Sequence, residues 1–178
     1  STLYICWASE AALYHFYGIE KVAIDNKLFG VFKHTVTDKK HPLFRGFDDE
    51  FYVPHSRHTT ILKSDLESKE EISILSESAT AGVAIVSSRG GREFYLTGHS
   101  EYAPLTLHDE YVRDRAKGHD IAVPENYYAD NNPENPPLVC WTSHANLLFN
   151  NWLNYFVYQE TPYHLEDVEH LGEIKHNG

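Results

Sequence analysis

The chain has 178 residues, of which 42% are hydrophobic and 23% charged, enough for one globular domain with its own core. Its formal net charge of −11 opposes binding to nucleic acid, and no apolar run is long enough to cross a bilayer, so we expect neither a nucleic-acid nor a membrane partner. There is no signal-peptide pattern, and two cysteines are too few for a disulfide scaffold, which favours a reduced, cytoplasmic setting.

The first third of the chain predicts one helix among extended segments. Residues 2–6 have the pattern of a short buried strand, and 8–17 that of a helix that Gly18 ends. Residues 22–24, 28–36 and 48–53 are typical of extended structure, and we expect a loop at 55–58.

The middle of the chain predicts a hairpin, and the last third predicts two helices. A short helix or turn is expected at 64–71, and strands at 72–75, 83–86 and 93–97, the last two joined by the turn at 88–91. Thr106 is the expected N-cap of a helix over 107–117, and Ser143 that of a closing helix to about 159. Residues 124–137 form a long loop, and the charged tail at 164–178 is expected to be flexible.

The alternation of strands and helices predicts an α/β fold with a mostly parallel sheet. The first segment has the character of a strand from the middle of a sheet, and we therefore expect an upstream part that pairs with it. We take residues 1–163 as the catalytic domain.

Cys6 stands where a buried strand runs directly into a helix. Such a turn exposes the side chain above the sheet, and the helix N-terminus favours a thiolate. The N–H of Trp7, directly after the cysteine, would help to hold an oxyanion. Cys6 is therefore a candidate nucleophile; the alternative is a small buried residue at a strand end.

His99 and Glu101 form a His-x-Glu pair directly after a predicted strand. Residues two apart in extended backbone point to the same side, so the carboxylate can orient the imidazole. The alternative is a loop histidine beside a surface acid.

Three further features have weaker signals. The stretch 55–58 holds two histidines three apart, but no second ligand pair stands at a usual spacing, so we favour substrate positioning or a solvated loop and expect no metal. Arg113 could hold a carboxylate, whereas Arg115 is expected on an exposed face. Cys140, just before the closing helix, is expected to pack.

Several motifs in order along residues 1–163 resemble the homoserine O-succinyltransferase/O-acetyltransferase family. They are Tyr-Ile-Cys-Trp at 4–7, Phe-Gly-Val-Phe at 29–32, His-Ser-Arg-His-Thr at 55–59, Gly-His-Ser-Glu-Tyr at 98–102, Glu-Tyr-Val-Arg-Asp-Arg at 110–115 and the helix at 146–162. Each motif alone is weak, and the ordered set is specific.

The resemblance implies a flavodoxin-like, three-layer fold related to class I glutamine amidotransferases. It implies that Cys6 takes an acyl group from acetyl- or succinyl-coenzyme A, and that His99, oriented by Glu101, activates the hydroxyl of homoserine. Lys27, Ser56 and Arg113 stand where the family contacts its substrate, with Arg113 on the amino-acid carboxylate. It also implies a homodimer, with small-molecule substrates and no bound cofactor.

The elbow departs from the family pattern: Ala8 and Ala12 replace glycines, and Glu10 replaces an amide. Glu10 adds a negative charge one helical turn from the sulfur, which either tunes the nucleophile or favours the helix N-terminus. The sequence leaves open the acyl donor and a serine acceptor in place of homoserine. A glutamine amidohydrolase on the same fold and an inactive homologue are the alternatives to an acyltransferase.

Overall fold

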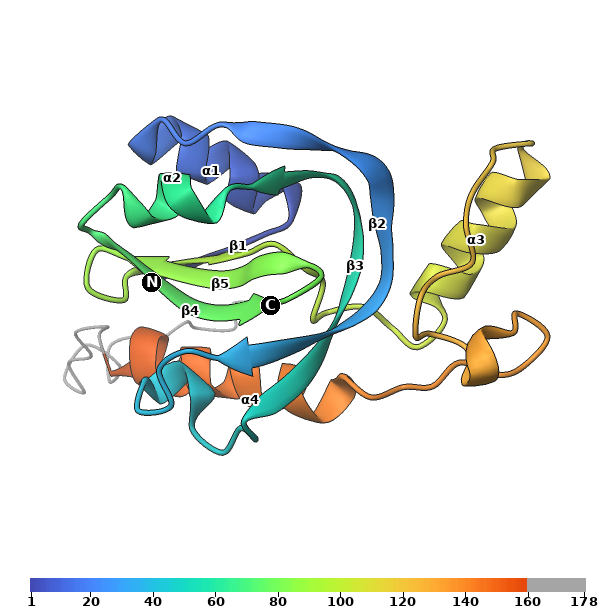
Figure 1. Cartoon of the computed structure of the whole chain (residues 1–178). Helices are drawn as coiled ribbons and strands as arrows, with labels where there is room; N and C mark the ends of the chain where they lie inside the picture. Colours follow the sequence, from blue (N-terminus) through green and yellow to red (C-terminus); the bar gives the residue numbers. More distant parts are fainter. Residues whose placement is uncertain (160–178) are drawn as a thin grey trace, which may run out of the picture.

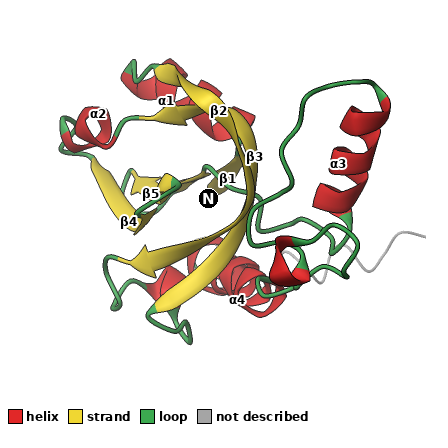
Figure 2. Ribbon diagram, turned by 45° about the vertical axis from the view of Figure 1, so that its right-hand side comes forward, coloured by secondary structure: helices red, strands yellow, loops and turns green. Residues whose placement is uncertain are grey.

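The computed structural model describes residues 1–159 and shows a sheet between two helical layers. Helices α1 (Trp7–Tyr17) and α2 (Lys63–Glu67) lie on one side of the sheet, and α4 (Thr142–Trp152) lies on the other (Figures 1 and 2). The strand order is β1-β6-β5-β4-β2-β3. The strands are β1 (Thr2–Ile5), β2 (Lys21–Val36), β3 (Glu50–Ile61), β4 (Ile72–Ser78), β5 (Gly82–Ser88) and β6 (Glu93–Leu96).

Within the described residues, β1 and β6 form the one parallel pair of strands, and the expectation of a mostly parallel sheet is wrong. The reason lies in the connections. Parallel neighbours need a crossover of a dozen or more residues, whereas short turns at 79–81 and 89–92 join β4 to β5 and β5 to β6. The expected hairpin at 83–97 is confirmed by the antiparallel register of β5 and β6.

Strands β2 and β3 form a long antiparallel hairpin that curves around one end of the sheet (Figure 2). The two extended segments expected at 22–36 are one strand, with an irregular register between Ala23 and Leu28. The loop expected at 55–58 is also wrong, because these residues lie within β3. Polar side chains stand on both faces there, which hides the alternation of a strand: His55 and Arg57 are buried, and His58 is exposed.

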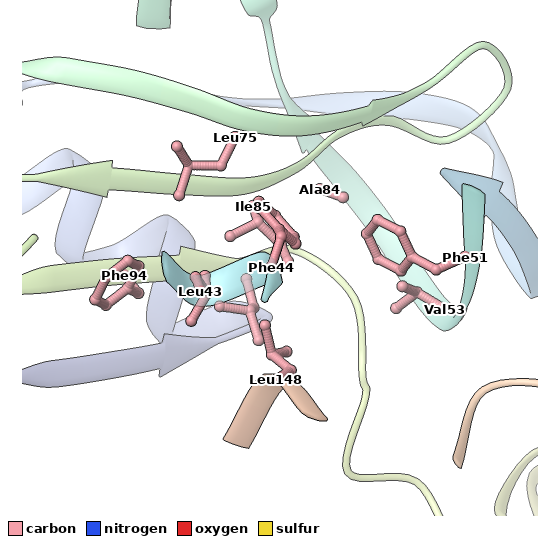
Figure 3. Close-up of a cluster of buried hydrophobic side chains, with 10 residues drawn as sticks. Leu43, Phe44, Phe51, Val53, Leu75, Ala84, Ile85, Phe94 and Leu148 are labelled. Atoms are coloured by element: carbon pink, nitrogen blue, oxygen red, sulfur yellow. The ribbon is translucent and has the colours of Figure 1, made fainter. Parts of the chain in front are cut away.

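The apolar core is divided by the sheet. One cluster, which includes Phe51, Ile85, Phe94 and Leu148, fills the space between the sheet and α4 (Figure 3). A second cluster packs α1 against the opposite face through residues such as Leu13 and Tyr95. Both helical layers are thus held by the burial of apolar surface, the main stabilising term in folding.

Helix α3 (Thr106–Ala116) stands apart from the two layers, as Figure 1 shows, and a third apolar cluster joins its segment to β2. The loop after α3 docks on β2 through two backbone bonds, from the Val31 N–H to the Glu125 carbonyl and from the Glu125 N–H to the Phe29 carbonyl. Gly30, with a φ of 147°, allows this approach because a Cβ there would collide with the backbone of Glu125. The arm that carries α3 is therefore fixed along an edge of β2 by backbone pairing.

The helix ends differ in detail from expectation. Gly18 ends α1 in a left-handed conformation, as predicted. Thr106 and Ser143 do not cap their helices, because the N-cap positions are held by Leu105 and Trp141 without side-chain bonds. The closing helix continues as a π-helix, η3 (Leu153–Tyr158), and the tail at 164–178 lies outside the described residues. Over residues 1–159, no helix is both long and apolar enough to span a membrane.

Candidate active site

Cys6 lies on a strained turn between β1 and α1. Its φ of 50° and ψ of −116° are unusual for a residue with a side chain, at a cost on the order of 1–3 kcal/mol. The surroundings hold this conformation, because the Cys6 N–H donates to the Leu96 carbonyl at 2.7 Å and the Cys6 carbonyl accepts from the Glu10 N–H at 3.1 Å. This is the geometry of a nucleophile elbow.

His99 follows β6, the parallel neighbour of β1, so the two residues meet at the same edge of the sheet. Its N–H donates to the Pro54 carbonyl at 2.8 Å, and its Nδ1 lies 2.6 Å from Glu101 Oε1. Burial lowers the pKa of His99, but hydrogen bonds with Cys6 and Glu101, together with their charges, outweigh it and raise the pKa to about 9. The structure therefore brings Cys6, His99 and Glu101 into one chain of contacts.

Trp7 begins α1, and its indole is exposed. The first N–H groups of a helix have no partner within it, so the Trp7 N–H is free of the helix ladder beside the sulfur. This is the position that an oxyanion donor requires, and the assignment stays a prediction.

The three residues expected to bind substrate converge on a fourth, Glu110 of α3. Lys27 Nζ lies 2.6 Å from Glu110 Oε1, and the Ser56 hydroxyl donates to the same oxygen at 2.8 Å. Arg113 Nη2 is 3.8 Å from that oxygen, while its Nε donates to Asp114 at 2.7 Å. Sequence reasoning missed Glu110, although its place one turn before Arg113 on the same helix was a usable signal.

Sequence reasoning also missed Tyr102, which lies between the residues around His99 and those around Glu110. Its ring stacks on the His99 imidazole with centroids 4.2 Å apart, and Trp141 Nε1 donates to its carbonyl at 3.0 Å. Burial, and the charges of Glu110 and Cys6, raise the pKa of its phenol. Glu110 on α3 is therefore close enough for its charge to act on Tyr102, the residue that stacks on His99.

The structure places three other features that the sequence singled out. No group of three or more potential metal ligands occurs in residues 1–159, and His55 is fully buried while His58 faces outward. Cys140 is exposed, so the expectation that it packs is wrong; the neighbouring Trp141 fills that space instead. Glu10 is buried and accepts a hydrogen bond from the Thr59 hydroxyl at 2.7 Å.

The comparisons with known proteins agree with this geometry. The model of the family described as homoserine O-succinyltransferase matches residues 1–163. The chain belongs to the homoserine O-succinyltransferase family. A relative from Bacteroides fragilis named homoserine O-acetyltransferase is 62% identical over 168 residues, and one of the same name from Acetivibrio thermocellus is 54% identical over 169.

These alignments cover 94% and 95% of the chain but 55% of each relative, so the chain spans about half the length of the curated relatives that it matches. Among solved structures, a glutamine amidotransferase from Thermotoga maritima gives a TM-score of 0.59 at 16% identity, covering 88% of this chain and 62% of that one. Another from Methylobacillus flagellatus gives 0.57 at 11%, covering 85% and 61%. The expected α/β fold of glutamine amidotransferase type is confirmed, as is the expected family.

Proposed function

We propose that the full-length protein transfers an acetyl group from acetyl-coenzyme A to the side-chain hydroxyl of L-homoserine, through a thioester on Cys6. The observation that carries the proposal is the Cys6–His99–Glu101 chain on a nucleophile elbow, in a member of a homoserine acyltransferase family. The product would enter methionine biosynthesis, in the cytoplasm.

In the first half-reaction, the Cys6 sulfur attacks the thioester carbonyl of the donor. His99 accepts the thiol proton through its hydrogen bond with Cys6 and returns it to the departing coenzyme A sulfur. The Trp7 N–H, at the start of α1, would stabilise the oxygen of the tetrahedral intermediate. One thioester replaces another, so the acyl group stays activated on the enzyme.

The second half-reaction requires a neutral imidazole, since an alcohol is a poor nucleophile at neutral pH. Two of the contributions that raise the pKa of His99 come from Cys6, namely its hydrogen bond and its charge. Acylation removes both, so the pKa of His99 falls when the acyl-enzyme forms. His99 then accepts the proton of the homoserine hydroxyl, whose oxygen attacks the acyl carbonyl and releases the Cys6 sulfur.

The cluster around Glu110 supports recognition of an amino acid as the acceptor. Glu110 would accept the ammonium group of homoserine, in a position set by Lys27 and Ser56. Arg113 has a guanidinium that is more than half exposed, so it can turn to a substrate carboxylate and form paired hydrogen bonds. Opposite charges a short distance apart on one helix match the two charged groups of an α-amino acid.

The names of the relatives support acetyl as the transferred group, because the relatives from B. fragilis, Parabacteroides distasonis and Brevibacillus brevis are all named homoserine O-acetyltransferase. Succinyl-coenzyme A as donor and serine as acceptor remain the competing substrates. A homodimer stays a prediction.

Steady-state release of coenzyme A by the full-length protein tests the proposal with two donors and two acceptors. Acetyl-coenzyme A with homoserine should give the highest kcat/KM. A higher value with succinyl-coenzyme A would correct the donor, and a higher value with serine would correct the acceptor. Hydrolysis of glutamine, without any dependence on coenzyme A, would replace the proposal with an amidohydrolase.

A further inference from the structure

A chain of buried polar side chains lies on the inner face of the β2–β3 hairpin, beneath the catalytic pair. Arg57 Nε lies 3.4 Å from His55 Nδ1, and His55 Nε2 lies 3.3 Å from His34 Nε2. His34 Nδ1 in turn lies 2.9 Å from the Phe32 carbonyl oxygen. The curvature of the hairpin brings the two imidazoles together, with their rings stacked at 5.1 Å.

The direction of every hydrogen bond in this chain follows from its two ends. The Phe32 carbonyl can only accept, so His34 carries its proton on Nδ1 and accepts at Nε2. His55 must then donate from Nε2, which leaves its Nδ1 to accept from the Arg57 guanidinium, a group that can only donate. Both histidines are therefore neutral, each in one tautomer, and a proton added to either would place two N–H groups face to face.

This chain reaches the reacting residues at two points, one through packing and one through charge. The first is Gly98, directly before His99: a Cβ at Gly98 would lie 2.8 Å from His55 Nε2 and 2.6 Å from Val53 Cγ1, so the imidazole packs against bare backbone. The same segment is held from β3 by the bond from the His99 N–H to the Pro54 carbonyl. The position of the His55 ring therefore constrains the backbone position of His99.

The second point is Arg57, whose guanidinium is held between β3 and the turn that joins β4 to β5. Its Nη1 and Nη2 donate to the carbonyls of Thr59 and Ala81, at 2.5 and 2.6 Å. Burial lowers the pKa of Arg57, while the charges of Glu10 and Cys6 raise it. A buried positive charge, fixed by three hydrogen bonds, thus lies close enough to Cys6 and Glu10 to interact with their charges.

We propose that His55, supported by His34, is a positioning residue for the nucleophile and the base: its accepting Nδ1 orients Arg57 toward Cys6, and its ring sets the Gly98–His99 backbone. This inference rests on the proposed function for the identity of the reaction, whereas the contacts by which His55 positions its neighbours do not depend on it. His55 touches neither substrate nor sulfur in this arrangement and acts through its neighbours.

The titratable and charged groups that face His55 come from each element around it. They are His34 from β2, Arg57 from β3 and His99 after β6. Burial, followed by the charges of these three groups, lowers the pKa of His55 well below its ordinary value. The neutral form that the hydrogen-bond chain requires is therefore the form that the surroundings favour.

Two substitutions at His55 separate an orienting role from mere filling of space. In His55→Asn the side-chain oxygen stands near the place of Nδ1 and can still accept from Arg57, although the side chain is smaller. His55→Leu keeps more bulk against Gly98 but leaves Arg57 without its acceptor. His58→Asn and His58→Leu are the matched controls, since His58 is exposed on the opposite face of the same strand.

Each full-length variant is assayed for kcat and KM, and for the rate of Cys6 alkylation by iodoacetamide across pH. Alkylation is followed on the Cys6 peptide by mass, because Cys140 is exposed and would react as well. Thermal unfolding is recorded alongside. We expect kcat to fall about 100-fold in His55→Leu, the size of loss that a misplaced reacting group produces, and less in His55→Asn. KM should change little in both.

The alkylation profile of His55→Leu should move to higher pH, and the His58 variants should match the wild type in every readout. The proposal is overturned if His55→Leu keeps the wild-type profile and kcat, or if it is more active than His55→Asn. If His55→Leu does not fold, His34→Gln and His34→Leu repeat the comparison, since the glutamine carbonyl can accept from His55 Nε2.

The alkylation profile also separates this proposal from the proposed function. A shifted profile in a protein without acyl transfer would leave the positioning role in place and remove the acyltransferase. Acyl transfer by the wild type, together with an unshifted profile and an unaffected kcat in His55→Leu, would keep the acyltransferase and remove the positioning role.

Discussion

The two faces of β3 serve the site in different ways. The inner face, with His55 and Arg57, is buried, and in our proposal it supports Cys6 and His99 through fixed hydrogen bonds and backbone contacts. The outer face, with Ser56, meets Glu110 on the α3 arm through polar contacts at a half-buried surface. In the proposed mechanism one strand thus separates the reaction from recognition of the acceptor, and substitutions on the two sides should separate kcat from KM.

The largest effect is expected at the base. His99→Ala should lower the rate at which homoserine discharges the acyl-enzyme by about 10²- to 10⁴-fold, the usual contribution of a general base. Rapid-quench mass measurement of the acyl-enzyme follows this step directly, with His58→Ala as the control. An unchanged discharge rate would mean that another residue is the base, and would contradict the assignment of the reaction to His99.

Acid should destabilise the inner face. Burial lowers the pKa of His34 from 6.5 to about 4, so between these values the unfolded chain binds more protons than the folded one. The contribution of His34 to the free energy of unfolding is therefore fully present above pH 6.5. It is lost as the pH falls toward 4, by on the order of 3 kcal/mol. Urea unfolding at several pH values measures the loss.

His34→Gln is the reference for that experiment, because it removes the titrating group and should flatten the acid slope. His99 contributes with the opposite sign: its pKa is raised to about 9, so its stabilisation is present below pH 6.5 and is lost as the pH rises to 9. An acid slope that is the same with and without His34 would contradict the buried neutral pair.

On the outer face, Glu110→Gln should raise KM for homoserine by about 10- to 100-fold, since hydrogen bonds to charged groups contribute roughly 1.5–3 kcal/mol. The rate of acylation by the donor should not change, because Glu110 acts on the acceptor. Asp109→Asn, an exposed acid on the same helix, is the matched control. A loss of acylation in Glu110→Gln would mean that the two faces are not separate.

The smallest effect is expected at Tyr102, which joins the two faces. Tyr102→Phe keeps the ring on His99 and should retain activity, whereas Tyr102→Leu should lower kcat by at most about tenfold, in line with the 0.5–1.5 kcal/mol of an aromatic pair. Steady-state kinetics of both variants measure the difference. Equal losses in the two variants would assign the effect to the phenol hydroxyl.

The candidate residues of the proposed reaction could be named from the sequence because each has a local sign. A cysteine between a strand and a helix, and a His-x-Glu pair after a strand, are visible without knowing any long-range contact. Glu110 had only a weaker sign, its place one turn before Arg113, since its role depends on Lys27 and Ser56, which are 83 and 54 positions away.

The fold was predicted at the level of its layers, but not at the level of strand direction. Residues 55–58 of β3 were predicted to be a loop because they are polar; His55 and Arg57 are nevertheless buried, which reverses the usual relation between polarity and exposure. Their burial depends on the hydrogen-bond chain with His34, and a contact between strands cannot be seen in the pattern of one strand. The role of Glu10, which replaces an amide of the family pattern, was hidden for the same reason. Its partner Thr59 lies on β3, and a contact between α1 and β3 cannot be seen in the pattern of either segment.

The most direct test of the account is the intact mass of the full-length protein after brief exposure to acetyl-coenzyme A. We expect one added acetyl group that is absent in Cys6→Ala, is retained in Cys140→Ser and disappears when homoserine is added. An acetyl group that persists in Cys6→Ala, or no adduct in a protein that still acylates homoserine, would contradict the cysteine-linked intermediate.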